Sequence, residues 1–207
     1  MPFELGRPLG APDEPEFQTK VLRALLALFE RESGPVLEEF PEDAPGGVSG
    51  DMTGWVCPVN LPSPDAADGP RAAVAREIES LMPWYALAVE RRGRTTVGLS
   101  GLAVEEAARF LGDFIDDQAI ASPCPGVKLP QALKFAADDL KAWYLEAATA
   151  QPGPSVPQAL ADWFWTETAA GQMLLELRAV CRGIDTPAMQ LLGHKALVPR
   201  SHEHLTP

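Results

Sequence analysis

The chain has 207 residues, 46% of them hydrophobic, and carries a formal net charge of −12 at pH 7. This composition allows one folded domain with an appendage, and the negative charge argues against nucleic acid or anionic lipid as a partner. The sequence has no apolar run of about 18 residues, the length that a membrane span requires. Residues 1–8 lack the basic and apolar pattern of a signal peptide, so we expect a cytoplasmic protein.

Charge and cysteines are spread unevenly along the chain. Residues 1–70 carry 4 basic and 13 acidic side chains, whereas residues 71–207 carry 13 basic and 16 acidic ones. We therefore expect two regions of different character. Cys57, Cys124 and Cys181 lie far apart and fit neither a disulfide framework nor a zinc motif, which favours a reducing compartment.

The N-terminal region predicts one helix between extended pieces. Residues 2–16 are rich in proline and glycine and indicate turns and extended chain. The stretch 17–32 predicts an amphipathic helix, whose apolar side chains recur at helical spacing: Val21, Leu25 and Leu28, with Leu22 and Phe29 beside them. Gly34 ends this helix, and a short extended piece follows as far as Pro41.

Residues 41–70 predict a linker, because 11 of these 30 positions are proline or glycine. Within it, residues 54–61 form a small apolar island that includes Trp55 and Cys57. The island is expected to dock on a domain surface. A redox or ligand-contacting role for Cys57 is the other interpretation, although no neighbouring base or second cysteine supports it.

Periodic helices begin at Arg71. Residues 71–82 predict a helix that Pro83 breaks or kinks, with 84–92 continuing beyond it. Residues 95–99 give the one convincing strand pattern, and residues 102–117 predict another helix. Val104, Ala108, Leu111 and Ile115 line one face of this second helix, and Asp116 and Asp117 crowd its C-terminal end, where the macrodipole disfavours them.

Two long helices are predicted in the C-terminal half, at 130–150 and 155–182, and we expect them to pack as an antiparallel hairpin. In the second, Ser155 and Gln158 form a capping box, and Gly183 provides a stop. The core face of the first helix comprises Leu133, Ala136, Leu140, Trp143, Tyr144 and Ala147. The core face of the second comprises Val156, Leu160, Trp163, Phe164, Gly171, Leu174 and Cys181. A short helix then runs from Pro187 to Leu192, and the end of the chain is expected to be frayed.

Glu167 lies at the centre of the second helix's apolar arc. A buried carboxylate needs a partner, so we expect a hydrogen bond from an arginine, an indole or the Tyr144 hydroxyl. The other interpretations are a polar floor to a pocket lined by Trp163 and Tyr144, or a local irregularity that turns Glu167 to water. Trp165 points away from the arc, under a neighbouring segment or toward a partner.

The sequence displays no complete catalytic constellation. His202, Glu203 and His204 make a poor metal site on a loose tail, and a di-iron centre would need Glu-x-x-His pairs that do not occur. No phosphate-binding loop or nucleophile elbow is present. We predict no catalytic residue, metal ligand or cofactor. The candidate pocket or partner-surface residues are Trp55, Cys57, Tyr144, Trp163, Trp165 and Glu167.

Residues 2–45 resemble the closing stretch of the selenoprotein B-type reductases, which include the glycine, sarcosine and betaine reductase B subunits and their D-proline reductase relatives. The resemblance lies in residues 3–10, FELGRPLG, then Pro12-Asp13 and the helix from Phe17. Residues 55–60 and the helical remainder are similar to a C-terminal extension on bacterial homologues. The family implies reductive cleavage of a C–N bond by a selenolate or thiolate followed by Pro-x-Cys. That element is absent here, so no catalytic residue is carried over.

These observations predict a mostly α fold, with a helical bundle-like domain at 71–199 and at most a minor strand. An extended and helical appendage precedes it: 1–45 as the tail of a reductase-like domain and 46–70 as a linker, while 200–207 form a flexible tail. We expect a non-catalytic C-terminal module or fragment of such a reductase, which docks on its catalytic domain or subunit or shapes its substrate site. The alternative is a standalone helical protein that binds a small molecule or a protein partner.

Overall fold

The computed structural model describes residue 9 and residues 14–36, 38, 40–42, 69–151 and 157–205. The chain divides into two compact units, residues Met1–Trp55 and Val56–Pro207. Every regular element in the described ranges is helical, which confirms the predicted mostly α fold. None of the described helices is long and apolar enough to cross a membrane.

The described part of the N-terminal unit contains the helix α1 (Pro15–Ala27), continued by a 3-10 turn (Leu28–Glu30). Its buried residues are Phe17 and Val21, and the ring of Phe40 meets that of Phe17 edge-on at 6.0 Å. Ion pairs join Lys20 to Glu42 and Arg31 to Glu38. The extended piece after the helix therefore covers one side of α1 and leaves the other side uncovered within this unit.

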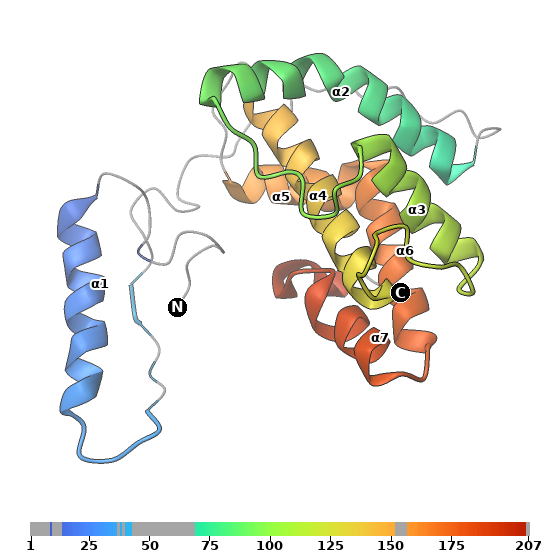
Figure 1. Cartoon of the computed structure of the whole chain (residues 1–207). Helices are drawn as coiled ribbons and strands as arrows, with labels where there is room; N and C mark the ends of the chain where they lie inside the picture. The colour runs from blue at the N-terminus through green and yellow to red at the C-terminus, as the bar shows by residue number, and fades with distance from the viewer. Residues whose placement is uncertain are drawn as a thin grey trace. The chain divides into compact units, whose positions relative to one another are not determined.

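The second unit, here called the helical unit, is built around α4 (Figure 1). Its helices are α2 (Pro70–Arg92), α3 (Val104–Asp116), α4 (Leu129–Thr149), α5 (Pro157–Glu167), α6 (Ala169–Gly183) and α7 (Pro187–Leu191), followed by a π-helical turn (Leu192–Ala196) and a 3-10 helix (Arg200–Leu205). Because α4 contacts α2, α3, α5 and α6, it forms the centre of the core.

The predicted core face of α4 is confirmed. Leu133, Ala136, Leu140, Tyr144 and Ala147 are fully buried, and Trp143 is nearly so. The ring of Trp143 stacks on Tyr85 of α2, with centroids 5.1 Å apart. Aromatic burial of this kind contributes strongly to core packing.

Pro83 does not break α2, which continues as one helix through this position to Arg92 (Figure 1). Proline removes only one helical hydrogen bond, and the tertiary contacts of α2 maintain the helix on both sides. Gly93, with φ of 64°, ends α2 in the left-handed conformation. At this end Arg91 donates to the Ala150 carbonyl and Arg92 to the Thr149 hydroxyl, so two cations lie at the C-terminus of α4.

The strand predicted at 95–99 is wrong: this segment is a loop held by two carboxylates of α4. Asp139 accepts the backbone N–H groups of Gly98, Leu99 and Ser100 at 2.8–2.9 Å, together with the Ser100 hydroxyl at 2.6 Å. Seven residues along α4, Glu146 accepts the N–H and hydroxyl of Thr96. Side-chain acceptors thus replace a partner strand, and the Asp139 side chain is buried.

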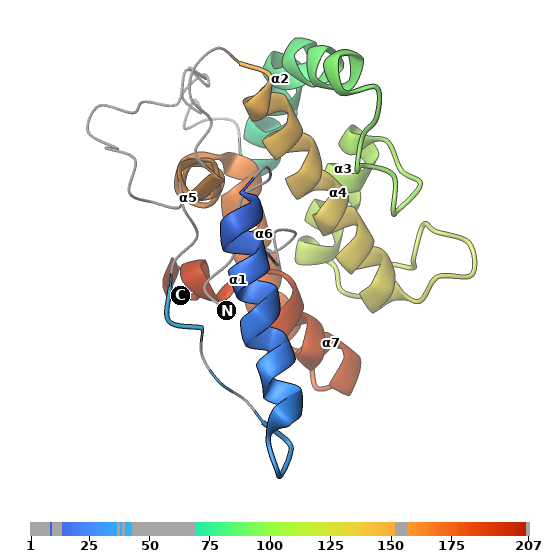
Figure 2. The same cartoon turned by 90° about the vertical axis from the view of Figure 1, so that its left-hand side faces the viewer.

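The long helix predicted at 155–182 is also wrong, because the structure divides it at Thr168 into α5 and α6. The Thr168 hydroxyl donates to the Phe164 carbonyl at 2.6 Å and accepts the Gly171 N–H at 2.9 Å, so it ends one helix and caps the next. The bend prevents the expected antiparallel hairpin: Figure 2 views α5 nearly along its axis while α4 runs across the view. The proposed capping residue Ser155 and Val156 lie outside the described residues.

The C-terminal segment is packed rather than frayed over its described part. Residues Arg200–Leu205 form a 3-10 helix, and His202 is buried. Its Nε2 lies 2.8 Å from Asp162 Oδ1. The buried guanidinium of Arg178 donates to the carbonyl oxygens of Gly193 and Glu203, which fastens the end of the chain to α6.

Candidate functional site

Glu167 is exposed, so the interpretation that places it in the core is wrong and the local irregularity is what the structure shows. The helix break follows it directly and turns its side chain out of the apolar arc. The other predicted members of that arc that the structure describes are buried: Leu160, Trp163, Phe164, Gly171, Leu174 and Cys181.

The buried carboxylate of this region is Glu77 of α2, whose exposed fraction is 6%. It accepts the N–H of Ala169 at 2.7 Å, the N–H of Ala170 at 3.3 Å and the Tyr144 hydroxyl at 3.0 Å. Glu77 therefore occupies the N-terminus of α6, where an anion is favoured by the free N–H groups and the helix dipole. Tyr144 does bind a buried carboxylate, but not the one the sequence indicated.

Burial raises the pKa of Glu77, and the hydrogen bonds from Ala169, Tyr144 and Ala170 oppose that rise only in part. The pKa of Tyr144 is raised well above its usual value by burial and by the adjacent Glu77 charge. For Asp139 and Glu146 burial acts in the same upward direction, but hydrogen bonds from the 95–100 loop outweigh it and lower both pKa values. All three carboxylates join elements of the fold, which gives them structural roles.

Tyr144 and Trp163 lie together in the interior. Their ring centroids are 6.4 Å apart, and Phe164 meets Tyr144 edge-on at 5.6 Å. Trp165 is buried as well, against Phe164 and beneath the ring of His202 at 6.1 Å. A neighbouring segment thus covers Trp165, as one of the two interpretations expected. Trp55 and Cys57 lie outside the described residues.

The described thiols are Cys124 and Cys181, both buried. Burial raises the pKa of Cys181 to about 12, which keeps it protonated at neutral pH. Cys124 Sγ donates to the Ser100 carbonyl at 3.2 Å. His202 is bound to Asp162 and Ser201, and the described ranges contain no group of three or more histidine, cysteine or acidic side chains placed to hold a metal.

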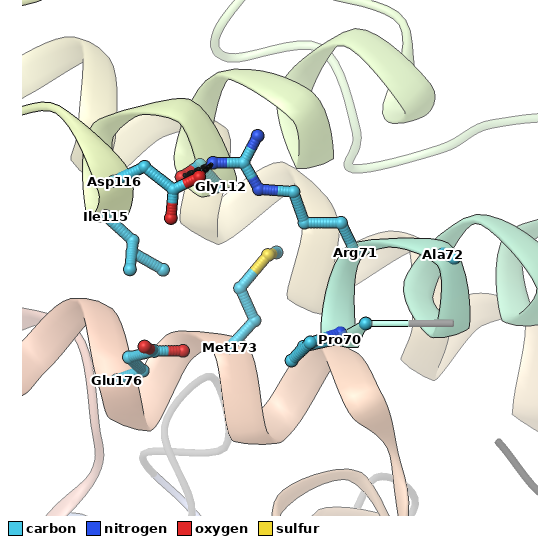
Figure 3. A pocket seen from close by; sticks show the side chains of 9 residues that line it. Pro70, Arg71, Ala72, Gly112, Ile115, Asp116, Met173 and Glu176 are labelled. Carbon is cyan, nitrogen blue, oxygen red and sulfur yellow. Dashed lines mark hydrogen bonds and ion pairs between the residues drawn. The ribbon is translucent and has the colours of Figure 1, made fainter. Parts of the chain in front are cut away.

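A cavity of about 490 Å³ opens where α2, α3 and α6 meet, all within the helical unit (Figure 3). Its lining residues are 69–72 at the start of α2, Gly112, Ile115 and Asp116 of α3, and Met173 and Glu176 of α6. The volume lies in the usual range for small-molecule sites. Sequence reasoning missed this cavity, because its three walls come from distant segments and no motif joins them.

One wall of the cavity is formed by the side chain of Arg71, whose guanidinium is hydrogen-bonded to α3. Arg71 donates to the Gly112 carbonyl at 2.6 Å and to Asp113 at 2.6 Å, and it also pairs with Asp116. A Cβ atom at position 112 would lie 3.0 Å from Arg71 Nε, so glycine gives the guanidinium room to lie against α3. This cation offsets the acidic C-terminal end of α3.

Comparison of the chain with family models, with curated proteins and with solved structures yields no match. The geometry of the described residues is accordingly the basis of the functional argument, together with the resemblance of residues 2–45.

Proposed function

We propose that the chain is a non-catalytic module that docks, through α1, on the catalytic domain or subunit of a selenoprotein B-type reductase. The carrying observation is the exposed apolar side of α1 and of the 3-10 turn that continues it, here called the α1 ridge: Leu22, Leu25 and Leu26 of α1 and Phe29 of the turn. Their exposed fractions range from 42% for Leu22 to 82% for Phe29. Residues spaced by three and four positions share one helix face, so these side chains form a continuous strip.

The partner that we propose for the α1 ridge is taken from the resemblance of residues 2–45 to the selenoprotein B-type reductases. Residues 2–45 resemble the stretch that closes the reductase domain in that family, and α1 lies inside this stretch. A helix that closes a domain buries its apolar side against that domain. Each large apolar side chain that becomes buried contributes about 1.5–3 kcal/mol.

A non-catalytic role is consistent with the two described thiols of the helical unit, Cys124 and Cys181. Reductive C–N cleavage of the family's kind requires a reactive selenolate or thiolate. The pKa of Cys181 is about 12, and the Cys124 thiol is buried and hydrogen-bonded to a backbone carbonyl. Cys181 is therefore protonated at neutral pH, and Cys124 is enclosed in the core.

The test measures binding of the full chain to a purified selenoprotein B-type catalytic subunit with cysteine in place of selenocysteine. We expect Leu26→Glu to weaken binding about ten-fold or more, since it places a charge in the apolar contact. Leu191→Glu on α7 is the matched control, because Leu191 is 60% exposed and Leu26 is 61% exposed. Isothermal titration at equal concentrations gives both values. No binding by the parent chain, or equal loss in both variants, would contradict the proposal.

The alternative function is a standalone helical protein that binds a small molecule. The cavity between α2, α3 and α6 favours it, because this site lies wholly in the helical unit and needs no contribution from α1. Ligand binding by a chain that fails to bind the reductase subunit would support this alternative.

A further inference from the structure

The geometry points to a ligand class for the cavity between α2, α3 and α6: a small organic cation with an apolar body, such as an arylalkyl amine, in which no carboxylate accompanies the ammonium. This inference goes beyond docking through α1 and is independent of it.

The walls of the cavity are largely apolar. Pro70 and Ala72 come from α2, Ile115 from α3, and Met173 from α6, where its thioether projects between the helices (Figure 3). The thioether is polarisable and packs well against aromatic rings. The cavity can therefore bury the hydrocarbon part of a ligand, which is the main source of affinity in such sites.

The charged groups at the cavity favour a cation. Arg71 is paired with Asp113 and Asp116, whereas Glu176 has no ion pair with another described residue. Among the lining residues, one guanidinium meets two carboxylates, a formal net charge of −1, and the Asp113 carboxylate that pairs with Arg71 lies behind this wall. Figure 3 shows Asp116 and Glu176 on the same side of the cavity, from α3 and α6, with Ile115 between them.

An anion is disfavoured at the start of α2, although a helix N-terminus ordinarily attracts one. Pro70 has no N–H to offer, and the N–H groups of Ala72 and Ala73 are directed to the Gly69 carbonyl. The guanidinium of Arg71 is likewise bonded to a carbonyl and two carboxylates. The N–H groups of Ala72 and Ala73 and the terminal nitrogens of Arg71 are thus engaged within the fold, while Glu176 has no ion pair with another described residue, so a ligand carboxylate would be repelled.

The ammonium of the ligand would bind Glu176 and the outer oxygen of Asp116. Both side chains are solvent-exposed, so their attraction for a cation is screened by salt. The apolar body then supplies most of the affinity and the carboxylates supply the discrimination by charge.

The experiment compares three probes of one skeleton on the full chain by isothermal titration in low salt: phenethylamine, phenylalanine and 3-phenylpropionate. We expect phenethylamine to bind, and the two carboxylates to bind about ten-fold more weakly or not at all, since each adds a like charge to the site. Binding of phenethylamine should weaken at 0.5 M NaCl, a concentration at which the Debye length is only about 4 Å.

Two variants locate the site. Glu176→Gln should weaken phenethylamine binding about three- to five-fold, the size of one exposed ion pair. Glu105→Gln is the control, because it removes the same charge from an exposed position at the opposite end of α3. Equal weakening by both variants, tighter binding of 3-phenylpropionate, or no binding of phenethylamine would each overturn the inference. Leu26→Glu does not change a residue of the cavity. Loss of amine binding and loss of binding to the reductase subunit can therefore be measured separately.

Discussion

The two units use amphipathic helices in opposite ways. In the helical unit, α4 buries residues on several faces, and even its carboxylates Asp139 and Glu146 are enclosed and hydrogen-bonded. In the N-terminal unit, α1 buries only Phe17 and Val21 and leaves the α1 ridge uncovered. The ion pairs of the N-terminal unit are exposed, and such pairs contribute about 0–1 kcal/mol each.

The two units therefore depend on different kinds of contact. In its described part, the helical unit buries most of its apolar helix faces and gives most of its buried polar side chains a hydrogen-bond partner, so its stability should depend on close internal contacts. In its described part, the N-terminal unit exposes the α1 ridge, and the proposed docking would bury these side chains. Substitutions that act in one unit and leave the other unchanged are the direct test.

The largest effect is expected for Gly171→Ala. A Cβ atom there would lie 2.0 Å from the Phe164 carbonyl oxygen, a backbone atom, so the bend between α5 and α6 would have to open. We expect a loss of about 3 kcal/mol or more in the free energy of unfolding of the helical unit. Urea denaturation followed by tryptophan fluorescence measures it. Gly183→Ala, at the end of α6 with no atom within 4 Å, should change stability by less than about 1 kcal/mol. Equal losses in the free energy of unfolding for Gly171→Ala and Gly183→Ala would contradict a close approach of position 171 to the Phe164 carbonyl oxygen.

A smaller loss is expected for Glu77→Leu, which leaves the Ala169 and Ala170 N–H groups and the Tyr144 hydroxyl without their acceptor. Such orphaned donors cost about 1–3 kcal/mol. Glu77→Gln retains one acceptor oxygen and should cost less. Urea denaturation at pH 7 gives both values.

The pH dependence of the Glu77→Leu effect has a definite sign. The pKa of Glu77 in the folded chain is raised above 4.5, so the folded state holds this proton more tightly than the unfolded state. The stability that Glu77 contributes is therefore fully present below pH 4.5 and declines as pH rises through the folded pKa. Glu77→Leu should be more destabilising at pH 4.5 than at pH 7. The reverse order would contradict the raised pKa.

The smallest effect is expected for Phe29→Ser on the α1 ridge. Phe29 is 82% exposed, so the unfolding free energy of the helical unit should change by less than about 0.5 kcal/mol. Four of the five tryptophans lie in the helical unit and Trp55 falls in the N-terminal unit, so the measurement is made in a Trp55→Phe background, in which fluorescence reports on the helical unit. Phe17→Ser is the contrasting variant: it removes the contact with Phe40 and should increase amide exchange in α1 alone. A shift of the fluorescence transition by either substitution would show that the units are coupled.

Much of the helical pattern could be predicted from the sequence, because it depends on local periodicity. The core face of α4, the helix that contains Val104 and Leu111, and the stop at Gly183 are examples. The break at Thr168 could not be predicted in the same way. The apolar period continues across it, and position 171 holds glycine rather than the glutamate or glutamine of a capping box.

The buried carboxylates were missed for a related reason. Glu77 lies on the core face of α2 between Val74, Ile78 and Leu81, which is the same signal that drew attention to Glu167. At Glu77 this pattern does mark a buried carboxylate, whereas Glu167 lies at the end of α5 and is exposed because the helix breaks at Thr168. The cavity between α2, α3 and α6 depends on how three helices meet, and periodicity within one helix contains no information about that.

The corner at Thr168 also bears on the order of events in folding. The Ala169 N–H and the Glu77 carboxylate that holds it are 92 residues apart in the chain. Helices form within about a microsecond, whereas contacts between such distant segments must await the closure of a long loop. The bend should therefore become fixed late, after α2 and α6 have met. In stopped-flow measurements, Glu77→Gln should then mainly increase the unfolding rate of the protein. A slower folding rate would instead show that the bend at Thr168 is already formed in the folding transition state.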